Sequence, residues 1–394
     1  MKPMPTPDDL IVHLDSPTDD AHEDRTVVQG WAASQVEIRE IAIIQDQLCP
    51  LKLEPRPDVV AAFPSRRYVR GFCGIIEQSQ FADSCVTLQI GTAGGVTHRL
   101  FPLPTGEADR KAIKAKKLGS IASHLQCPHC RAPIPAPLER GPFTCAACGR
   151  AYQSRDGAFD FLSEDVRSQF KIIDTPNISS NRYDPAALGV IGECHDGLVL
   201  DCGAGQRNLV FPNVINFEIV PYPNTDVLGV NERLPFRDGT FDAVLSLSVL
   251  EHVRDPFASA SEICRVLKPG GQLYCSVPFL QPLHGYPHHY FNMTAQGLSR
   301  LFEEQVFIEK SGVIESGLPI WSLAWILRSW AAGLEGQTRE DFLARRVGDL
   351  IGSPETYLSE KFVSELPPEK NRELASCTVL MGRKLPAISQ VVAL

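Results

Sequence analysis

The sequence predicts an α/β protein whose largest part holds a mostly parallel sheet, preceded by an all-β module and a metal-binding segment. Three observations support this fold class. Apolar strand-like runs alternate with amphipathic segments over residues 180–394. Two Cys-x-x-Cys pairs lie at residues 127–130 and 145–148, and short β-branched runs separated by Gly, Pro and Asp occupy residues 26–104. A chain of 394 residues has room for two or three domains.

The charge balance disfavours a general binder of nucleic acids. The chain has 38 basic and 47 acidic residues, a net charge of -9, whereas phosphate contacts need clustered Lys and Arg. One basic run, "RKAIKAKK" at residues 110–117, is typical of a solvated linker or helix face. The alternative for this run is a local contact with RNA.

Residues 1–25 are acidic and rich in Pro, which predicts a disordered tail. They contain neither the basic nor the apolar region of a secretory signal. The chain has twelve cysteines, and without such a signal metal binding is favoured over disulfides. We therefore expect a cytoplasmic protein.

The module at residues 26–104 is expected to consist of short strands and turns. Its strings "GWAAS", "RPDVVAAFPS" and "RGFCG" resemble a β-sandwich module found in bacterial glycosyltransferases and neighbouring polysaccharide enzymes. The resemblance implies a packing or docking role and brings no catalytic motif.

The two cysteine pairs predict a zinc ribbon over residues 121–163. The 14 residues between the pairs are enough for the chain to fold back and bring four thiolates onto one ion; the candidate ligands are Cys127, Cys130, Cys145 and Cys148. A site with four protein ligands leaves no position for a substrate, so the zinc would be structural. The alternatives are a redox pair or a chance spacing. The segment resembles zinc ribbons ahead of some bacterial methyltransferase domains, where they serve substrate recognition or domain packing.

The string "LVLDCGAGQRNLV" at residues 198–210 predicts a strand followed by a ligand-binding turn. Gly203 and Gly205 allow a sharp turn and a close approach of the backbone to a ligand. The next apolar strand ends at Glu218, where an acid is placed to bind the ribose hydroxyls of an adenosine-containing cofactor. The alternative is a surface glutamate without that role.

Residues 234–279 carry the most specific motif of this part, "LPFRDGTFDAVLSLSVLEHVRDPFASASEICRVLKPGGQLYCSVPF". Here the chain resembles the class I S-adenosylmethionine-dependent methyltransferases, in particular the type 11 family, over residues 196–315. The resemblance implies a Rossmann-like fold with a mostly parallel seven-stranded sheet, and S-adenosylmethionine as the cofactor.

The resemblance also implies roles for individual residues. Gly203 and Gly205 would flank the methionine part of the cofactor, Asp201 would steady the loop, and Glu218 would hold the ribose. The family usually has an Asp-Ala pair at the adenine edge, where this chain has Val230 and Asn231, so Asn231 is the candidate for that contact. A third glycine of the family turn is replaced by Arg207.

The loop "PFLQPLHGYPHHYFNMT" follows the last strand of the motif and is expected at the ligand edge of the sheet. Histidine suits a base that accepts a proton near neutral pH. His288 and His284 are the candidates for a base or substrate-positioning residue, and His252 in "LEHV" competes with them. Two alternatives stay open: histidines that only structure the loop, and a metal site.

The last strands of the sheet are expected at "QVFIEKSGVIES" (305–316) and "SCTVLMGRKL" (376–385), separated by a helical insertion at about residues 316–374. About ten strongly apolar residues in a row are too few to span a bilayer, which needs about 20. The insertion is therefore expected to be a lid. The alternative is a helix at the membrane surface that gathers a lipid-linked acceptor.

Taken together, the sequence predicts methyl transfer from S-adenosylmethionine to an oxygen of a sugar or glycan precursor, with a small molecule or glycan as partner. One alternative is an RNA methyltransferase that uses the zinc ribbon for recognition. The other is a non-catalytic binding scaffold, suggested by Arg207 and Val230.

Overall fold

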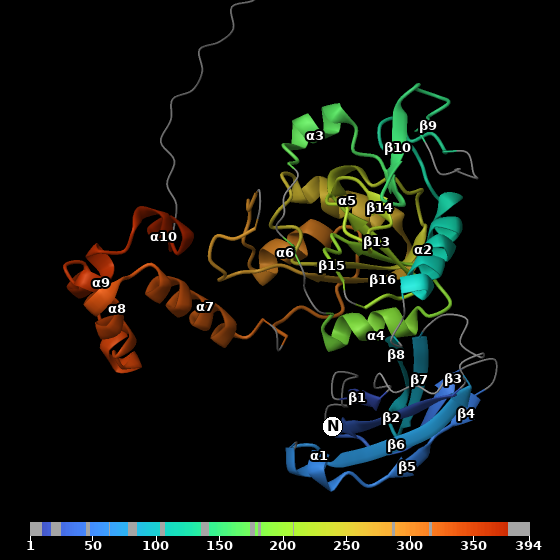
Figure 1. Cartoon of the computed structure of the whole chain (residues 1–394), viewed down its shortest axis with the longest axis horizontal. Coiled ribbons are helices and arrows are strands. Elements are labelled where there is room, and N and C mark those ends of the chain that lie inside the picture. Colours follow the sequence, from blue (N-terminus) through green and yellow to red (C-terminus); the bar gives the residue numbers. More distant parts are fainter. Residues whose placement is uncertain are drawn as a thin grey trace, which may run out of the picture. The chain divides into compact units, whose positions relative to one another are not determined.

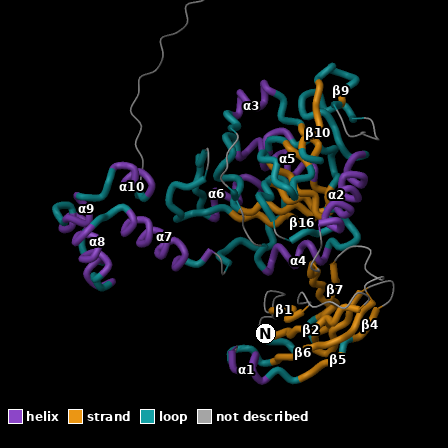
Figure 2. Tube along the Cα trace, viewed as in Figure 1, coloured by secondary structure: helices purple, strands orange, loops and turns teal. Residues whose placement is uncertain are grey.

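The structure is a computed structural model of the whole chain. It describes residues 10–16, 25–44, 48–62, 64–77, 85–102, 107–134, 142–173, 178–179, 183–207, 209–285, 288–314 and 317–376 (Figures 1 and 2). The chain divides into two compact units. The first comprises Met1–Pro278 and Tyr286–Gly312, and the second comprises Phe279–Gly285 and Val313–Leu394.

The first unit begins with a β-sandwich of two four-stranded antiparallel sheets. One sheet has the order β1 (Ile11–Ser16), β2 (Arg25–Ser34), β6 (Tyr68–Glu77), β5 (Lys52–Glu54). The other has the order β4 (Leu48–Pro50), β3 (Ile38–Ile44), β7 (Cys85–Thr92), β8 (Gly95–Pro102), and helix α1 (Pro57–Ala62) lies between β5 and β6 in the chain. Apolar side chains from both sheets form one core, including Val28, Ile41, Phe72 and Leu88.

The expectation of a disordered tail over residues 1–25 is wrong for residues 10–16, and residues 1–9 and 17–24 lie outside the described residues. Ile11–Ser16 form β1, which pairs antiparallel with β2. The preceding Leu10 is 8% exposed and packs into the sandwich core. An edge strand is stabilised by the sheet that it joins, and a composition rich in Asp and Pro does not reveal that contact.

The second part of the first unit is built on an eight-stranded sheet. Its order is β16 (Leu267–Ser276), β15 (Phe241–Leu247), β12 (Val199–Cys202), β13 (Val214–Glu218), β14 (Val227–Leu228), β11 (Ala158–Asp160), β10 (Ala151–Arg155), β9 (Phe143–Thr144). The six strands from β16 to β11 are parallel, and β10 and β9 are antiparallel. The order of β12 to β16 places a topological switch point between β12 and β15, where ligands bind in open α/β sheets.

Both faces of this sheet are covered, which explains its continuous apolar strands. Alternate residues of β12 face opposite sides: Val199 packs with α4 (Pro185–Glu193), and Leu200 packs with α5 (Pro256–Val266). The cluster around Leu200 also includes residues of α2 (Glu107–Ala122) and α6 (Ala295–Phe302). Figure 1 shows α2 alongside the sheet. The expected α/β fold class is thereby confirmed.

The composition of the sheet differs from the expectation. Its sixth parallel strand is β11, which comes from the cysteine-rich segment. Residues 305–314, expected to begin a strand, form no strand, and Phe307 is 88% exposed. An apolar run becomes a strand only where a neighbouring strand pairs with it. The partner expected at 376–385 lies, after residue 376, outside the described residues.

The second unit is helical over the residues that the structure describes. Its elements are α7 (Pro319–Ala332), α8 (Gly336–Leu343), η5 (Val347–Leu350), η6 (Pro354–Tyr357), α9 (Lys361–Ser364) and α10 (Pro368–Glu373). Its small core contains Ala331, Leu334, Phe342, Phe362 and Leu366. Among the described helices, none has the length and apolar character needed to cross a bilayer.

Candidate functional site

The four predicted cysteine ligands converge. The Sγ atoms of Cys127 and Cys148 are 3.7 Å apart, those of Cys130 and Cys145 are 3.5 Å apart, and all four lie within 4.8 Å of one another. Zinc–sulfur bonds of about 2.3 Å in a tetrahedron place the sulfurs about 3.8 Å apart. The donor set and its geometry therefore fit one zinc ion with no position for a substrate.

The two cysteine pairs lie in similar turns. Arg131 N donates to Cys127 O at 2.8 Å in the first turn, and Gly149 N donates to Cys145 O at 2.9 Å in the second. Both residues have positive φ, 62° and 73°. A side chain at this conformation is unusual, so the first turn carries a strained arginine where the second has glycine.

The predicted glycine turn follows β12 at the carboxyl end of the sheet. Gly203 and Gly205 have φ values of 84° and 63°. A Cβ atom at Gly203 would lie 2.5 Å from Val249 Cγ2, and one at Gly205 would lie 2.7 Å from Ser179 O. The turn therefore excludes side chains both by conformation and by space. Its amides are engaged within the protein: Gly203 N donates to Phe217 O at 2.9 Å, and Gly205 N donates to Glu218 at 2.8 Å.

Asp201 lies below this turn with its carboxylate fully engaged. Arg207 Nε donates to Asp201 Oδ2 at 2.9 Å, and Tyr183 Oη donates to the same oxygen at 2.6 Å. The Arg207 guanidinium also stacks 4.2 Å from the Tyr183 ring centre. Asp201 and Arg207 are 0% and 6% exposed. Arg207, which replaces the third glycine of the family turn, thus stabilises the turn through its buried contact with Asp201.

Glu218 ends β13 beside the turn. Its Oε2 accepts from Gly205 N at 2.8 Å, and its Oε1 accepts from Ile219 N at 2.7 Å. Burial raises the pKa of Glu218 above its ordinary value, and the two amide bonds oppose this rise. A carboxylate held at the end of a strand, with lone pairs left over, can accept bonds from two vicinal hydroxyls.

Asn231 begins the short helix η3 (Asn231–Arg233) after β14. Its Oδ1 accepts from Cys202 Sγ at 3.2 Å, and the residue is 7% exposed. Within the described parts of the chain, its Nδ2 forms no hydrogen bond. A side-chain amide carries two donor hydrogens on Nδ2, which can bond an acceptor such as a ring nitrogen of adenine.

Of the three candidate histidines, two lie together in the first unit. His252 follows β15, and its Nδ1 is 2.7 Å from the carbonyl oxygen of His288. A carbonyl only accepts, so in the neutral ring Nδ1 carries the proton and Nε2 does not. His284 belongs to the second unit, where its Nδ1 lies 2.8 Å from Pro282 O and its ring packs on Trp325.

Glu251 is a residue to which the sequence assigned no role. It is 0% exposed, its Oε1 is 3.7 Å from His252 Nε2, and its carbonyl accepts from Tyr290 N and Phe291 N. Burial raises the pKa of its carboxyl to about 8. Its place in "LEHV", directly after an apolar strand, is the signal that could have identified it. The residue links the end of β15 to the histidine loop.

The strand order and the ligand turn together define a class I methyltransferase domain. Residues 212–275 match a family model of the type 11 methyltransferases, described as "Methyltransferase domain". The match includes β13, η3 and "LEHV", and it ends in β16.

Curated relatives match a short part of the chain. An uncharacterized methyltransferase of Schizosaccharomyces pombe is 44% identical over 63 residues, 16% of this chain and 23% of that protein. A ubiquinone biosynthesis O-methyltransferase of Xanthomonas oryzae pv. oryzae is 44% identical over 50 residues, 13% of this chain and 21% of that protein. The chain thus spans less than a quarter of the length of these relatives.

Solved structures that match part of the chain include an S-adenosylmethionine-dependent methyltransferase of Thermotoga maritima, 19% identical, with a TM-score of 0.25. The alignment covers 32% of this chain and 82% of that chain. A complex of the Haloferax volcanii Trm112 methyltransferase activator with a methyltransferase is 23% identical over 21% of this chain and 46% of that chain, with a TM-score of 0.18. TM-scores this low carry no argument about substrate or partner.

Proposed function

We propose that the protein transfers a methyl group from S-adenosylmethionine to a hydroxyl oxygen of a sugar or glycan precursor. The observation that carries this proposal is the shared edge of the sheet. The glycine turn after β12, Glu218 at the end of β13 and His252 after β15 all lie at the carboxyl ends of neighbouring strands. The groups proposed to bind the cofactor and the candidate base thus come from strands on both sides of the topological switch point, which supports the proposal.

Three groups near the end of β12 would hold the cofactor: the glycine turn, Glu218 and Asn231. The side-chain-free turn at Gly203 and Gly205 would let the methionine part pass close to the backbone, Glu218 would accept from the ribose hydroxyls, and Asn231 Nδ2 would donate to adenine. When bound, S-adenosylmethionine supplies an electrophilic methyl group on a sulfonium. Arg207 does not weaken this assignment, because its guanidinium is turned inward to Asp201.

His252 is the best placed base within the first unit. Its Nε2 would accept the hydroxyl proton while the acceptor oxygen forms the new bond to the methyl carbon. The His288 carbonyl keeps the ring in the tautomer that leaves Nε2 unprotonated. Because the Glu251 carboxyl has a pKa of about 8, it is mostly neutral at pH 7 and places little negative charge beside His252.

A sugar acceptor is supported by the resemblance of the N-terminal sandwich to modules of glycosyltransferases and by the acidic net charge. The RNA alternative rests partly on the basic run at residues 110–117, and two lysines of this run have partners within the protein. Lys117 of the basic run forms a buried ion pair with Asp226, and Lys114 Nζ donates to the carbonyls of Asp156 and Pro223. Two of its lysines therefore stabilise the fold.

Two measurements test the proposal. Calorimetry of the zinc-loaded protein with S-adenosylhomocysteine should show binding, and its absence would leave only the scaffold alternative. A methyl-label transfer screen should then compare nucleotide sugars, lipid-linked glycans and bulk RNA. Label in the sugars or glycans supports the proposed acceptor, whereas label in RNA alone would overturn it.

The proposed compartment is the cytosol. Cysteines that bind zinc must stay reduced, and a reducing compartment keeps them so.

A further inference from the structure

The loop 229–238 makes up most of the connection between β14 and β15 and contains Asn231, the residue proposed to contact adenine. The zinc ribbon holds this loop at both ends. At its start, Phe161 N donates to Leu228 O at 3.0 Å, where β11 pairs with β14. Near its end, Gln126 N donates to Pro235 O at 3.0 Å, and Arg237 N donates to His124 O at 2.8 Å. The ribbon is thus part of the wall beside the cofactor site.

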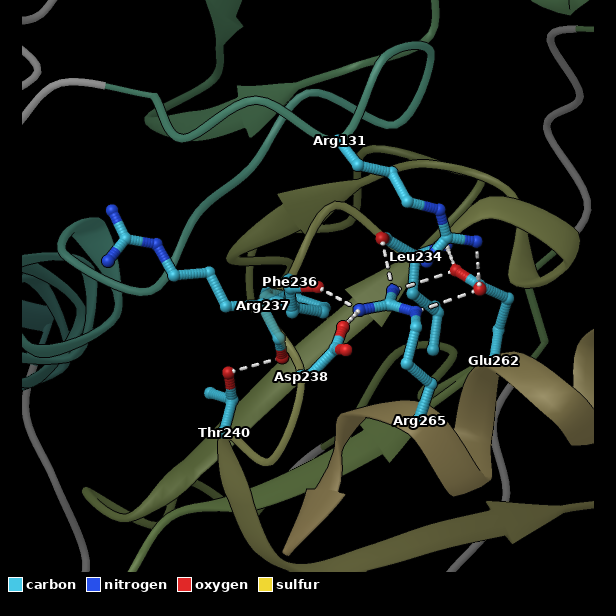
Figure 3. Close-up of polar contacts among 8 residues, drawn as sticks. All are labelled: Arg131, Leu234, Phe236, Arg237, Asp238, Thr240, Glu262 and Arg265. Carbon is cyan, nitrogen blue, oxygen red and sulfur yellow. Dashed lines mark hydrogen bonds and ion pairs between the residues drawn. The ribbon is translucent and has the colours of Figure 1, made fainter.

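Helix α5 holds the middle of the same loop through Arg265 and Glu262 (Figure 3). Arg265 donates to the carbonyls of Leu234 and Phe236 at 3.0 and 2.6 Å. Glu262 Oε2 accepts from Leu234 N at 2.9 Å and from Arg265 Nη2 at 2.8 Å. The carboxylate of Glu262 therefore fixes the residue that follows η3.

Arg131 of the ribbon completes this network. Its Nη2 donates to Glu262 Oε1 at 2.7 Å, as Figure 3 shows, and the same oxygen accepts from Arg265 Nε at 2.8 Å. The Glu262 side chain is 7% exposed and that of Arg131 is 56% exposed. Burial opposes ionisation of Glu262, but the bonds from Arg265 and Arg131 outweigh it and lower its pKa. The first cysteine turn, which carries Arg131, thereby acts directly on the group that fixes Leu234.

We propose that Arg131 is a positioning residue for the cofactor: it couples the zinc-bound turn to the adenine side of the site through Glu262 and Leu234. This inference rests on the proposed function. It predicts that loss of the Arg131 contact weakens cofactor binding while the chemical step is kept. Since Arg131 uses a single donor atom toward Glu262, a lysine can replace the contact.

The test compares Arg131→Ala, Arg131→Lys and Arg300→Ala. Arg300 is the matched control, because its side chain is 57% exposed and pairs only with Glu303 and Glu304 among the ion pairs seen in the described residues. The Kd for S-adenosylhomocysteine should rise about threefold to fivefold in Arg131→Ala, the range for a partly exposed ion pair. It should be unchanged in Arg131→Lys and Arg300→Ala. In turnover, KM for S-adenosylmethionine should rise and kcat should be kept.

Zinc content, melting temperature and hydrogen exchange of the peptide 229–238 are measured on the same variants. Faster exchange of this peptide in Arg131→Ala, at unchanged zinc content, supports the coupling. Wild-type Kd and wild-type exchange in Arg131→Ala would overturn it. So would an equal loss of affinity in the Ala and Lys variants. Failure of the wild-type protein to bind S-adenosylhomocysteine would instead overturn the proposed function and the role of Arg131 in cofactor binding. Hydrogen exchange would then test only whether Arg131 orders the loop 229–238.

Discussion

Lys117 and Asp226 form an ion pair inside the first unit, with Lys117 Nζ 2.5 Å from Asp226 Oδ2 and side chains 2% and 0% exposed. Lys117 comes from α2, ahead of the zinc ribbon, and Asp226 precedes β14. The pair ties the helix between sandwich and ribbon to the parallel sheet. A lysine that sequence alone would assign to a solvated face is thus a core residue.

The first prediction concerns this ion pair. Replacing Lys117 by Met should destabilise the fold by about 3 to 5 kcal/mol, because Asp226 would be left as an uncompensated buried charge. Urea unfolding of the purified protein measures the change. The control is Lys116→Met on the exposed side of the same helix, expected to change stability by less than about 0.5 kcal/mol. The double variant Lys117→Met with Asp226→Asn should recover most of the loss, and equal effects at both lysines would contradict a buried pair.

The second prediction concerns the zinc site. Cys127→Ala should lose the metal and lower the melting temperature, since a structural zinc contributes directly to folding. Elemental analysis and thermal unfolding check both. Cys264→Ala is the control, because Cys264 is partly buried in α5 and lies outside the four-thiol cluster. A Cys127→Ala protein that kept its zinc and its melting temperature would disprove the site.

The third prediction concerns the candidate base. His252→Asn should lower kcat by about 10²-fold to 10⁴-fold, the usual contribution of general base catalysis. The Kd for S-adenosylhomocysteine should stay the same, because His252 is assigned to the acceptor. His195→Asn, after α4, is the matched control and should keep its activity. Full activity of His252→Asn would move the role to another group.

The fourth prediction concerns the pH dependence set by Glu251. Burial raises its folded-state pKa from 4.5 to about 8, so the folded protein keeps a proton that the unfolded chain releases. Its stabilising contribution is full below about pH 4.5 and is lost as the pH rises through about 8. Glu251→Gln, which mimics the protonated form, should therefore gain stability over the wild type as the pH rises from 5 to 8, up to about 5 kcal/mol.

Melting temperatures of both proteins from pH 5 to pH 9 test this. The difference should grow up to about pH 8 and then stay constant. A difference that is independent of pH would show that Glu251 has the same pKa in the folded and unfolded states.

Features with a short-range signal were predictable. The spacing of the cysteine pairs predicted four converging thiols, and the "LEHV" and "LPF" strings led to the methyltransferase domain. Such motifs depend on turns of a few residues, whose geometry the local sequence encodes. The strand expected at 305–316 was wrong for the opposite reason. Its apolar residues needed a partner strand, and pairing is a property of the assembled sheet.

The sequence by itself determined the class of fold, the four converging cysteines and the glycine turn, because each rests on local backbone geometry or on residues close together in the chain. Only the tertiary structure decided that β11 of the ribbon joins the parallel sheet and that Arg207 turns inward to Asp201. It alone also brought Arg131 to Glu262. Contacts between distant residues arise from how strands and helices pack, and no local pattern specifies them.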